Sequence, residues 1–245
     1  MISFVNVAPP CSRSMNVRLS TAKRALKAAA QKALGHQSWN SDDDQIALLG
    51  SPRIIFDVGA NIGQTAASYR TLFPQAQIFS FEPDPETFKK LEAAFAGDSH
   101  VSPIPFALSD RQARIPMNIM EHSVVNSILQ PIGDWAKTEK VIDVQTTTVD
   151  LFCRERGIEQ IDILKVDAQG AELAIFHGAI ETFQKRGVRA VFTEIYFDPV
   201  YSGMALFGDL DGELRNHGFR LHGIYSLTAG TDGHLDFGNA LYYLE

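Results

Sequence analysis

Cysteine is scarce in this sequence. The 245 residues include only two, Cys11 and Cys153, and their wide separation forms no metal-binding or redox spacing. So few cysteines argue against a disulfide-stapled secreted domain and fit a reducing compartment, so we expect a cytoplasmic protein. The seven histidines show no metal-ligand spacing either, which excludes the common zinc motifs.

Long apolar runs are also missing. No stretch reaches the ~18 uninterrupted apolar residues that a membrane span requires, and the first residues lack the basic start and apolar core of a secretory signal. We therefore expect no transmembrane segment. Hydrophobic residues still make up 45% of the chain, which is enough for one α/β domain of ordinary size.

Acidic residues are absent from residues 1–41, which contain six bases. Within them, residues 18–34 are alanine-rich and predict a helix that ends before Gly35, and a linker at 40–45 completes an N-terminal extension of residues 1–50. Three interpretations of the extension stay open: a helix packed on the domain or over its cofactor, an organelle-targeting segment within residues 1–36, or a basic helix in peripheral contact with an anionic membrane.

The rest of the chain is acidic, with 16 bases against 29 acids once residues 1–41 are set aside. Binding of a polyanion depends on a cationic face. We therefore expect no nucleic-acid partner for the domain at residues 51–245. The sequence does not indicate an oligomeric state.

A glycine-containing turn is the most informative motif that is present. The apolar run Ile54-Ile-Phe56 leads into Asp57-Val-Gly59-Ala60-Asn61-Ile-Gly63-Gln64-Thr65, and a helical pattern follows. Such a turn brings bare backbone and the free N–H groups of a helix start close to a ligand. The turn differs from the dinucleotide fingerprint and opens with an acid, which suits a cationic ligand such as S-adenosylmethionine and disfavours a pyrophosphate.

Glu82 ends the next strand-like run, at 77–82, and follows Gly63 by 19 residues. In a βαβ unit this spacing places an acid beneath a ribose diol. One nucleoside-containing ligand can then touch both the turn and Glu82. The alternative is an ordinary surface acid at the end of a strand.

Several blocks in order resemble the FkbM-type S-adenosylmethionine-dependent methyltransferases over roughly residues 51–243. The blocks are Ile55 to Thr65, Phe81-Glu-Pro83, Ala107-Leu-Ser-Asp110, Ser127-Ile-Leu129, Asp162 to Glu172, and Glu194 with Tyr201-Ser-Gly203. The resemblance implies a Rossmann-like class I fold, with a seven-stranded, mostly parallel sheet of order 3-2-1-4-5-7-6 and helices on both faces. Ligands of such sheets bind at the carboxyl ends of the strands near the point where the strand order reverses.

The resemblance also implies which residues surround the cofactor. Glu82 would bind the ribose, and a glycine turn and a third segment would bind the methionine part and the adenine. The turn residues are Asp57, Gly59, Ala60, Asn61 and Gly63, assisted by Gln64 and Thr65, and the adenine residues are Ala107, Leu108 and Asp110.

Strand and helix patterns alternate beyond the linker, as in a parallel sheet with helical crossovers. We expect strands at 53–58, 77–82, 101–107, 161–167, 188–195, 219–226 and 237–244, and helices at 64–73, 85–96, 147–156, 170–185 and 205–217. Between the third strand and its helix, residues 108–146 contain two alternating runs, 113–119 and 141–146, that predict an extra hairpin.

A segment of this length within a compact domain usually has a function. We expect it to recognise the acceptor, and the candidates are His122, Asn126, Ser127 and Trp135, together with Tyr201. As an alternative, the polar residues are only solvated loop groups and Trp135 covers an edge of the core.

Asp167 and Glu194 end adjacent strands and are the acids best placed for chemistry. An alcohol that attacks a methyl group needs a base or a metal ion. Either carboxylate is a candidate base, and the pair are candidate ligands for Mg²⁺ or Mn²⁺. Lys165 alternates onto the same strand face as Asp167, so a partly buried ion pair between these two residues is the structural alternative.

These observations together predict an S-adenosylmethionine-dependent methyltransferase. The family resemblance alone suggests the acceptor, a hydroxyl of a small molecule or glycan. The alternatives are N-methylation, transfer of another group such as aminopropyl from a related sulfonium, and a cofactor-binding module without turnover.

Overall fold

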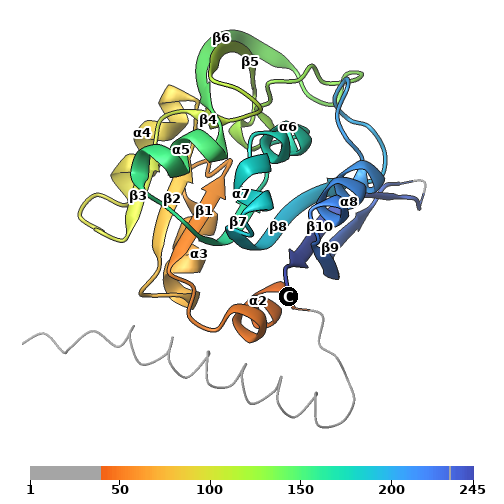
Figure 1. Cartoon of the computed structure of the whole chain (residues 1–245). Coiled ribbons are helices and arrows are strands. Elements are labelled where there is room, and N and C mark those ends of the chain that lie inside the picture. Colours follow the sequence, from red (N-terminus) through yellow and green to blue (C-terminus); the bar gives the residue numbers. More distant parts are fainter. Residues whose placement is uncertain (1–39, 232) are drawn as a thin grey trace, which may run out of the picture.

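The computed structural model describes residues 40–231 and 233–245, and Figure 1 shows their arrangement. The predictions made for the first 39 residues therefore lie outside the described part of the chain. These are the helix at 18–34 and its three interpretations. Within the described residues, no helix is both long enough and apolar enough to cross a membrane.

A seven-stranded sheet forms the centre of the domain, in the order β3-β2-β1-β7-β8-β10-β9. β10 runs antiparallel to both of its neighbours, and the other pairings are parallel. Counted along the chain within this sheet, the order is 3-2-1-4-5-7-6, which confirms the predicted fold. The strands are β1 (Ile54–Val58), β2 (Gln77–Phe81), β3 (Val101–Ile104), β7 (Ile161–Val166), β8 (Val188–Tyr196), β9 (Arg220–Ala229) and β10 (Leu235–Tyr243).

Helices cover both faces of this sheet, which explains why its inner strands are apolar at successive positions. On β1, Phe56 packs into a cluster with Phe152 and Phe176 from the helices on one face, whereas Ile55 packs with Tyr69 on the other. In Figure 1 α5, α7 and α8 lie in front of the sheet and α3 lies behind it. The helices are α2 (Ser41–Leu49), α3 (Gln64–Leu72), α4 (Pro85–Ala94), α5 (Val149–Arg156), α6 (Glu172–His177), α7 (Ile180–Gln184) and α8 (Phe207–Asn216).

Residues 40–45 do not form the linker that the sequence suggested. They are the N-cap and first turn of α2, where Asn40 Oδ1 accepts a hydrogen bond from the Asp42 N–H. Tyr69 donates to Gln45 and Tyr225 donates to Asp44. The polar run Ser-Asp-Asp-Asp is therefore a capped helix start. Because α2 packs against the domain, the predicted boundary at residue 50 divides a helix from the domain to which it is bonded.

Two other predicted elements are divided in the structure. The helix expected at 170–185 breaks into α6 and α7 around Gly178, where a Cβ atom would lie only 2.0 Å from the Ser109 carbonyl oxygen. The strand expected at 101–107 ends at Ile104, and β4 (Ala107–Leu108) pairs instead with a second sheet. Both divisions result from contacts between segments far apart in sequence, which local patterns do not reveal.

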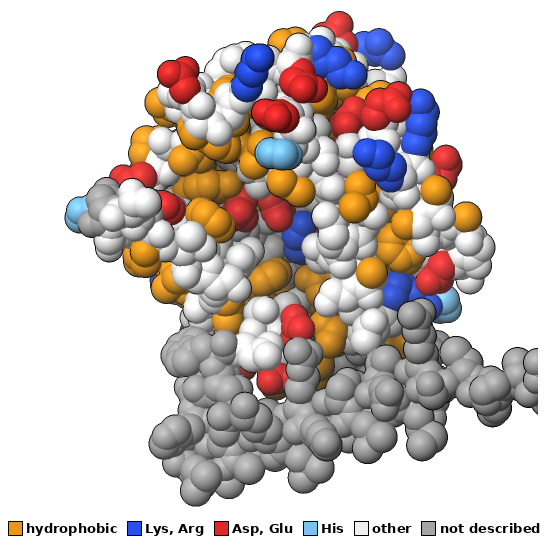
Figure 2. All heavy atoms as spheres, turned by 180° about the vertical axis from the view of Figure 1, so that it is seen from behind, with side chains coloured by type: hydrophobic (Ala, Val, Ile, Leu, Met, Phe, Trp, Pro, Cys, Tyr) orange, Lys and Arg blue, Asp and Glu red, His pale blue; other side chains and the backbone are white. Residues whose placement is uncertain are grey.

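The second sheet has three strands and confirms the extra hairpin. β5 (Ala113–Met120) pairs antiparallel with β6 (Thr138–Thr147), and β6 pairs with β4. A short 3-10 helix, η1 (Ser123–Val125), follows β5. The hairpin lies at the top of the view in Figure 1. Figure 2 shows the opposite side of the molecule, where acidic and basic side chains lie side by side in the upper part.

Candidate active site

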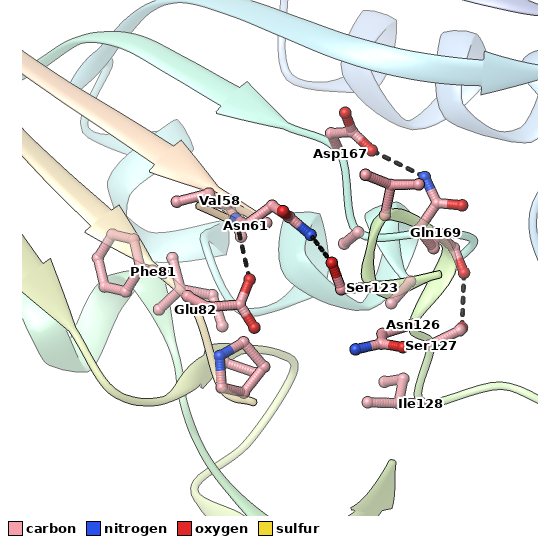
Figure 3. Close-up of a pocket in the computed structure, with 18 of the residues that line it drawn as sticks. Val58, Asn61, Phe81, Glu82, Ser123, Asn126, Ser127, Ile128, Asp167 and Gln169 are labelled. Atoms are coloured by element: carbon pink, nitrogen blue, oxygen red, sulfur yellow. Dashed lines mark hydrogen bonds between the residues drawn. The ribbon is translucent and has the colours of Figure 1, made fainter. Parts of the chain in front are cut away.

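A cavity of about 230 Å³ opens at the carboxyl ends of β1, β2 and β7 (Figure 3). The strand order reverses here, because the chain continues from β1 to β2 and β3 on one side and returns to β7 on the other. Many residues singled out from the sequence line this cavity: Gly59, Ala60, Asn61, Gln64, Thr65, Glu82, Ala107, Leu108, Asn126, Ser127, Lys165 and Asp167.

The glycine turn fits tightly against the end of β7. Gly59 has a φ of 74°, and a Cβ atom there would lie 1.8 Å from the Asp167 carbonyl oxygen. Only glycine can occupy this position without moving one of the two segments. The N–H groups of Gly59 and Ala60 donate to the Phe81 carbonyl, at 3.1 and 2.9 Å, which attaches the turn to the end of β2.

Glu82 lies under this turn. Its Oε2 accepts a hydrogen bond from the Asn61 N–H and its Oε1 accepts one from the Asp84 N–H, each at 2.9 Å. The side chain is only 5% exposed, and burial raises the pKa of the carboxyl to about 7. Because each carboxylate oxygen has two acceptor positions, both oxygens can still accept from the two hydroxyls of a ribose.

Lys165 is buried between two acids. Its Nζ lies 3.3 Å from Asp57 Oδ1 and 3.6 Å from Asp167 Oδ2, and it donates to the Val58 carbonyl. Burial lowers the pKa of Lys165, but the charges of Asp167 and Asp57 raise it more, so the pKa lies above its ordinary value. The structural alternative proposed for Lys165 and Asp167 is therefore present. Asp57 is fully buried beneath the turn and does not line the cavity.

Asp167 and Glu194 lie side by side, joined by Gln169. The Gln169 Nε2 donates to Asp167 Oδ1 and to Glu194 Oε2, each at 2.9 Å. Burial, together with the nearby charge of Asp167, raises the pKa of Glu194 to about 9. The hydrogen bond from Gln169 to Asp167 is drawn in Figure 3, where the two side chains face each other at the edge of the cavity.

Glu172 stabilises the turn after β7. Its Oε1 accepts from the N–H groups of Ala168, at 2.8 Å, and Gly170, at 3.4 Å. Burial raises its pKa to about 7. These contacts fix the main chain that carries Gln169.

The inserted hairpin completes the cavity from a third side. Asn61 Nδ2 donates to Ser123 Oγ at 3.1 Å, and Ser127 Oγ donates to the Gln169 carbonyl at 2.7 Å. Both contacts are drawn in Figure 3. The insertion therefore holds both the glycine turn and the turn after β7, which are two of the segments that line the cavity.

Several predicted residues lie outside the cavity. Asp110 pairs with Arg111 on the surface, His122 is exposed, and Gly63 caps the start of α3. Trp135 is 48% exposed and contacts the buried Tyr201 ring edge to face. Tyr201 reaches the site indirectly, because its hydroxyl lies 3.0 Å from both Gln169 Oε1 and the Val125 carbonyl oxygen.

Sequence reasoning missed Gln169, Ser123 and the apolar lining from Met117 and Ile128. Gln169 lies between a strand end and Gly170, a position that suggested a turn but gave no sign of which side chains it would meet. Ser123 and Met117 come from the insertion, whose placement over the sheet depends on tertiary contacts. The alternating pattern of the hairpin marked Met117 as facing one side without identifying that side.

No metal site is evident in residues 40–231 and 233–245. No three His, Cys, Asp or Glu side chains converge among them as ligands would. The two candidate ligands, Asp167 and Glu194, each accept a hydrogen bond from the side-chain amide of Gln169. The oxygen that accepts this bond would have to give it up in order to bind a metal ion.

Comparison with known proteins agrees with this geometry. Residues 57–221 match the methyltransferase FkbM domain, which is more than half of the chain. The chain belongs to the FkbM methyltransferase family. This match confirms the resemblance noted in the sequence and makes the chain an S-adenosylmethionine-dependent methyltransferase.

Two curated methyltransferases are similar to this chain. The 2-O-methyltransferase NoeI of Sinorhizobium fredii is 33% identical over 171 residues, covering 64% of this chain and 70% of the relative. The hexuronic acid methyltransferase AglP of Haloferax volcanii is 29% identical over 145 residues, covering 58% of this chain and 56% of AglP.

Solved structures are more distant. A precorrin-6y C5,15-methyltransferase from Geobacter metallireducens has 9% identity and a TM-score of 0.47 over 83% of this chain and 87% of that one. Fibrillarin from Aeropyrum pernix, solved with bound S-adenosylmethionine, has 14% identity and a TM-score of 0.46 over 81% and 73%. Likeness at this level adds nothing about the acceptor.

Proposed function

We propose that this methyltransferase transfers a methyl group from S-adenosylmethionine to a hydroxyl group of a sugar or another small polyol. The observation that carries the proposal is Asp167, which lines the cavity at the carboxyl end of β7 and is joined through Gln169 to the buried Glu194 behind it. A hydroxyl has a high pKa and must lose its proton during the transfer, so a nearby carboxylate is the group that such an acceptor requires.

The cavity suits the cofactor in three places. The close approach of Gly59 to Asp167 leaves bare backbone at the cavity wall, where the methionine part would lie. Glu82 keeps acceptor capacity for the ribose hydroxyls, and Ala107 and Leu108 offer an apolar wall for the adenine. When bound, the cofactor supplies an electrophilic methyl group and a neutral thioether leaving group.

We assign Asp167 as the base. Its carboxylate lines the cavity, and an acceptor hydroxyl between it and the methyl group would pass its proton to a carboxylate oxygen as the new O–C bond forms. Lys165 holds this carboxylate in place from below. Since Asp57 lies under Lys165 and outside the cavity, we assign it to the support of Lys165 and not to contact with the cofactor.

The relatives favour a sugar acceptor. NoeI is named as a 2-O-methyltransferase and AglP as a hexuronic acid methyltransferase. Lys165 is the one cation among the cavity-lining residues that the structure describes, and Asp57 and Asp167 already pair with it. A neutral sugar therefore fits this site better than a uronic acid, whose carboxylate would face Asp167 without a free cation.

An acceptor screen tests the proposal. Purified protein would be incubated with S-adenosylmethionine and a matched panel of neutral monosaccharides, their uronic acids and simple amines, with S-adenosylhomocysteine as the readout and mass spectrometry of the product. We expect methylation of a neutral sugar in preference to its uronic acid. Preferred amine methylation, or cofactor binding without turnover, would each contradict the proposal and support the corresponding alternative. Release of methylthioadenosine in place of S-adenosylhomocysteine would instead support transfer of another group from the sulfonium.

Chelation separates the base from a metal-assisted reaction. If Asp167 acts directly, activity persists in EDTA and does not rise when Mg²⁺ or Mn²⁺ is added. Loss of activity in EDTA and recovery with either ion would instead assign Asp167 and Glu194 as metal ligands.

A further inference from the structure

Gln169 is the residue on which contacts from four parts of the chain converge. It follows β7 with a φ of 51°, a left-handed conformation that is uncommon for a residue other than glycine. Its main-chain carbonyl accepts from Ser127 Oγ of the insertion. Backbone strain of this kind persists only where surrounding contacts fix it, and it is frequent at functional sites.

The side-chain amide of Gln169 has hydrogen-bond partners on both of its ends. Its two Nε2 hydrogens point to Asp167 Oδ1 and Glu194 Oε2. Its Oε1 lies 3.0 Å from the Tyr201 hydroxyl and 3.3 Å from the Tyr196 hydroxyl. Because the donors face two acids and the acceptor faces two hydroxyls, the orientation of the amide is determined by the network.

We propose that Gln169 is a positioning residue that holds Asp167 in the geometry required to accept the proton of the acceptor hydroxyl. The proposal rests on the methyl transfer proposed above and deepens it. The amide neither gains nor loses a proton in the reaction. It fixes one oxygen of Asp167 while Lys165 holds the other from the opposite side.

The surroundings of the two carboxylates explain why such a residue is needed. Asp167 faces Lys165, with Asp57 behind the lysine, and Glu194 faces Asp167, Glu172 and the hydroxyls of Tyr196 and Tyr201. A second acid beside Asp167 would repel its carboxylate if both were charged. One amide that donates to both keeps them at a fixed separation.

The chain offers a matched control for Gln169. Gln160 lies just before β7, is also half-buried, and its Nε2 donates to the carboxylate of an aspartate two residues away, Asp162. It is at the opposite edge of the sheet from the cavity. Gln160→Leu therefore makes the same chemical change just before β7, away from the site, that Gln169→Leu makes after β7.

The experiment compares Gln169→Leu, Gln169→Glu and Gln160→Leu with the parent, using the best acceptor from the screen. Leucine keeps the size of the side chain and leaves the Ser127 bond to the main-chain carbonyl, whereas glutamate keeps an acceptor for the tyrosines and removes the donors. We expect both Gln169 variants to lower kcat by roughly 10–100-fold, the scale of a misplaced catalytic group. Affinity for S-adenosylhomocysteine should stay within about 2-fold, and Gln160→Leu should match the parent.

A double variant tests whether Gln169 acts through Asp167. If it does, adding Gln169→Leu to Asp167→Asn should lower kcat little further, because the base that it positions is already lost. The assignment would be overturned if the loss of kcat in the double variant equalled the product of the two single losses. It would also be overturned if kcat were unchanged in both Gln169 variants. If Gln169→Leu does not fold, the kcat and cofactor affinity of Gln169→Glu, alone and combined with Asp167→Asn, decide the question. Absence of turnover in the parent with every acceptor would instead refute the proposed function and the assignment with it.

Discussion

Glu82 has both carboxylate oxygens bonded to main-chain N–H groups, one from the glycine turn and one from the segment that follows β2. It thus serves the fold before any ligand arrives. The same carboxylate lines the cavity, so at the scale of single residues one side chain joins the turn to the ribose position that we propose.

Replacing Glu82 by glutamine should weaken binding of S-adenosylhomocysteine by about 1.5–3 kcal/mol, the range for hydrogen bonds to a charged group. The parent's affinity should also rise between pH 6 and pH 8, because burial raises the pKa of Glu82 to about 7 and the ionised form accepts better from hydroxyls. Calorimetry at pH 6, 7 and 8 checks both points. A glutamine variant with the parent's affinity would remove Glu82 from the site.

Gly59→Ala should destabilise the protein by about 2–4 kcal/mol, because a new Cβ would meet the Asp167 carbonyl oxygen at 1.8 Å and also carry left-handed strain. Gly133 is the matched control. It has a similar φ of 76° but nothing within 4 Å of an added Cβ. Urea unfolding of both variants separates the clash from the strain, and equal losses would show that the close approach is not a constraint.

Single residues also show where prediction from sequence succeeded and failed. The pairing of Lys165 with Asp167 followed from strand alternation, and the position of Glu82 at the cavity followed from its spacing to the turn, which are local rules; the ribose contact of Glu82 stays a prediction. Asp57 was expected beside the cofactor, but the same alternation points it into the buried layer with Lys165. Gln169 was not recognised, because its importance depends on four segments that meet only in the folded chain.

Among the elements, α2 shows how a polar run can be misread. The run Asp42-Asp-Asp44 suggested a linker, yet acids in the first turn of a helix are stabilising. The helix is fixed from the domain side by the hydroxyls of Tyr69 and Tyr225. Its apolar contribution is small, since Leu49 is its buried hydrophobic residue, so hydrophobic periodicity could not reveal it.

Two truncations test the role of α2. A chain that begins at Asn40 keeps the helix, whereas one that begins at Ser51 loses the hydrogen bonds from Tyr69 to Gln45 and from Tyr225 to Asp44 as well as the buried Leu49. We expect the shorter chain to lose about 3 kcal/mol, from one buried apolar side chain and one unpaired buried hydroxyl. Differential scanning calorimetry provides the comparison.

The outcome also bears on residues 1–39. If the chain that begins at Asn40 is insoluble, the first of the three interpretations of the extension, a helix packed on the domain, gains support. Equal stability of the two truncated chains would contradict the role given to α2.

The order of the main sheet was predicted from the family resemblance, whereas the hairpin was predicted from the alternating runs at 113–119 and 141–146. The division of the helix at 170–185 was not. It depends on the approach of Ser109 to Gly178, a contact between the insertion's first strand and a distant crossover.

At the scale of the whole molecule, Glu82, Glu172 and Glu194 oppose the folded state at neutral pH, and so does Asp57, whose pKa burial also raises. Burial raises the pKa of Glu82 and Glu172 to about 7 and that of Glu194 to about 9, whereas in the unfolded chain each lies near its ordinary value. The folded state therefore binds more protons than the unfolded state above about pH 4.5. The stability from these groups is complete below that pH and is lost as the pH rises through their folded pKa values.

We therefore expect the melting temperature of the protein without cofactor to fall between pH 5.5 and pH 8. Lys165 stays charged over this range, since its pKa lies above its ordinary value. One kcal/mol changes the melting temperature of a domain of this size by roughly 2–4 °C. Glu172→Gln should reduce the slope, because Glu172 is an acid that contacts only the main chain of its own turn. A melting temperature that rises over this interval would contradict the account.

The central claim is that Asp167 accepts the proton of a hydroxyl during methyl transfer at the carboxyl edge of the sheet. The most direct measurement is the rate of S-adenosylhomocysteine formation by the parent and by Asp167→Asn with the preferred sugar acceptor, alongside calorimetric affinity for S-adenosylhomocysteine. The account predicts a loss of turnover of about 10²–10⁴, the contribution of a general base, with little change in cofactor affinity. Methylation by the asparagine variant at the parental rate would contradict it and leave Asp167 only as the partner of Lys165.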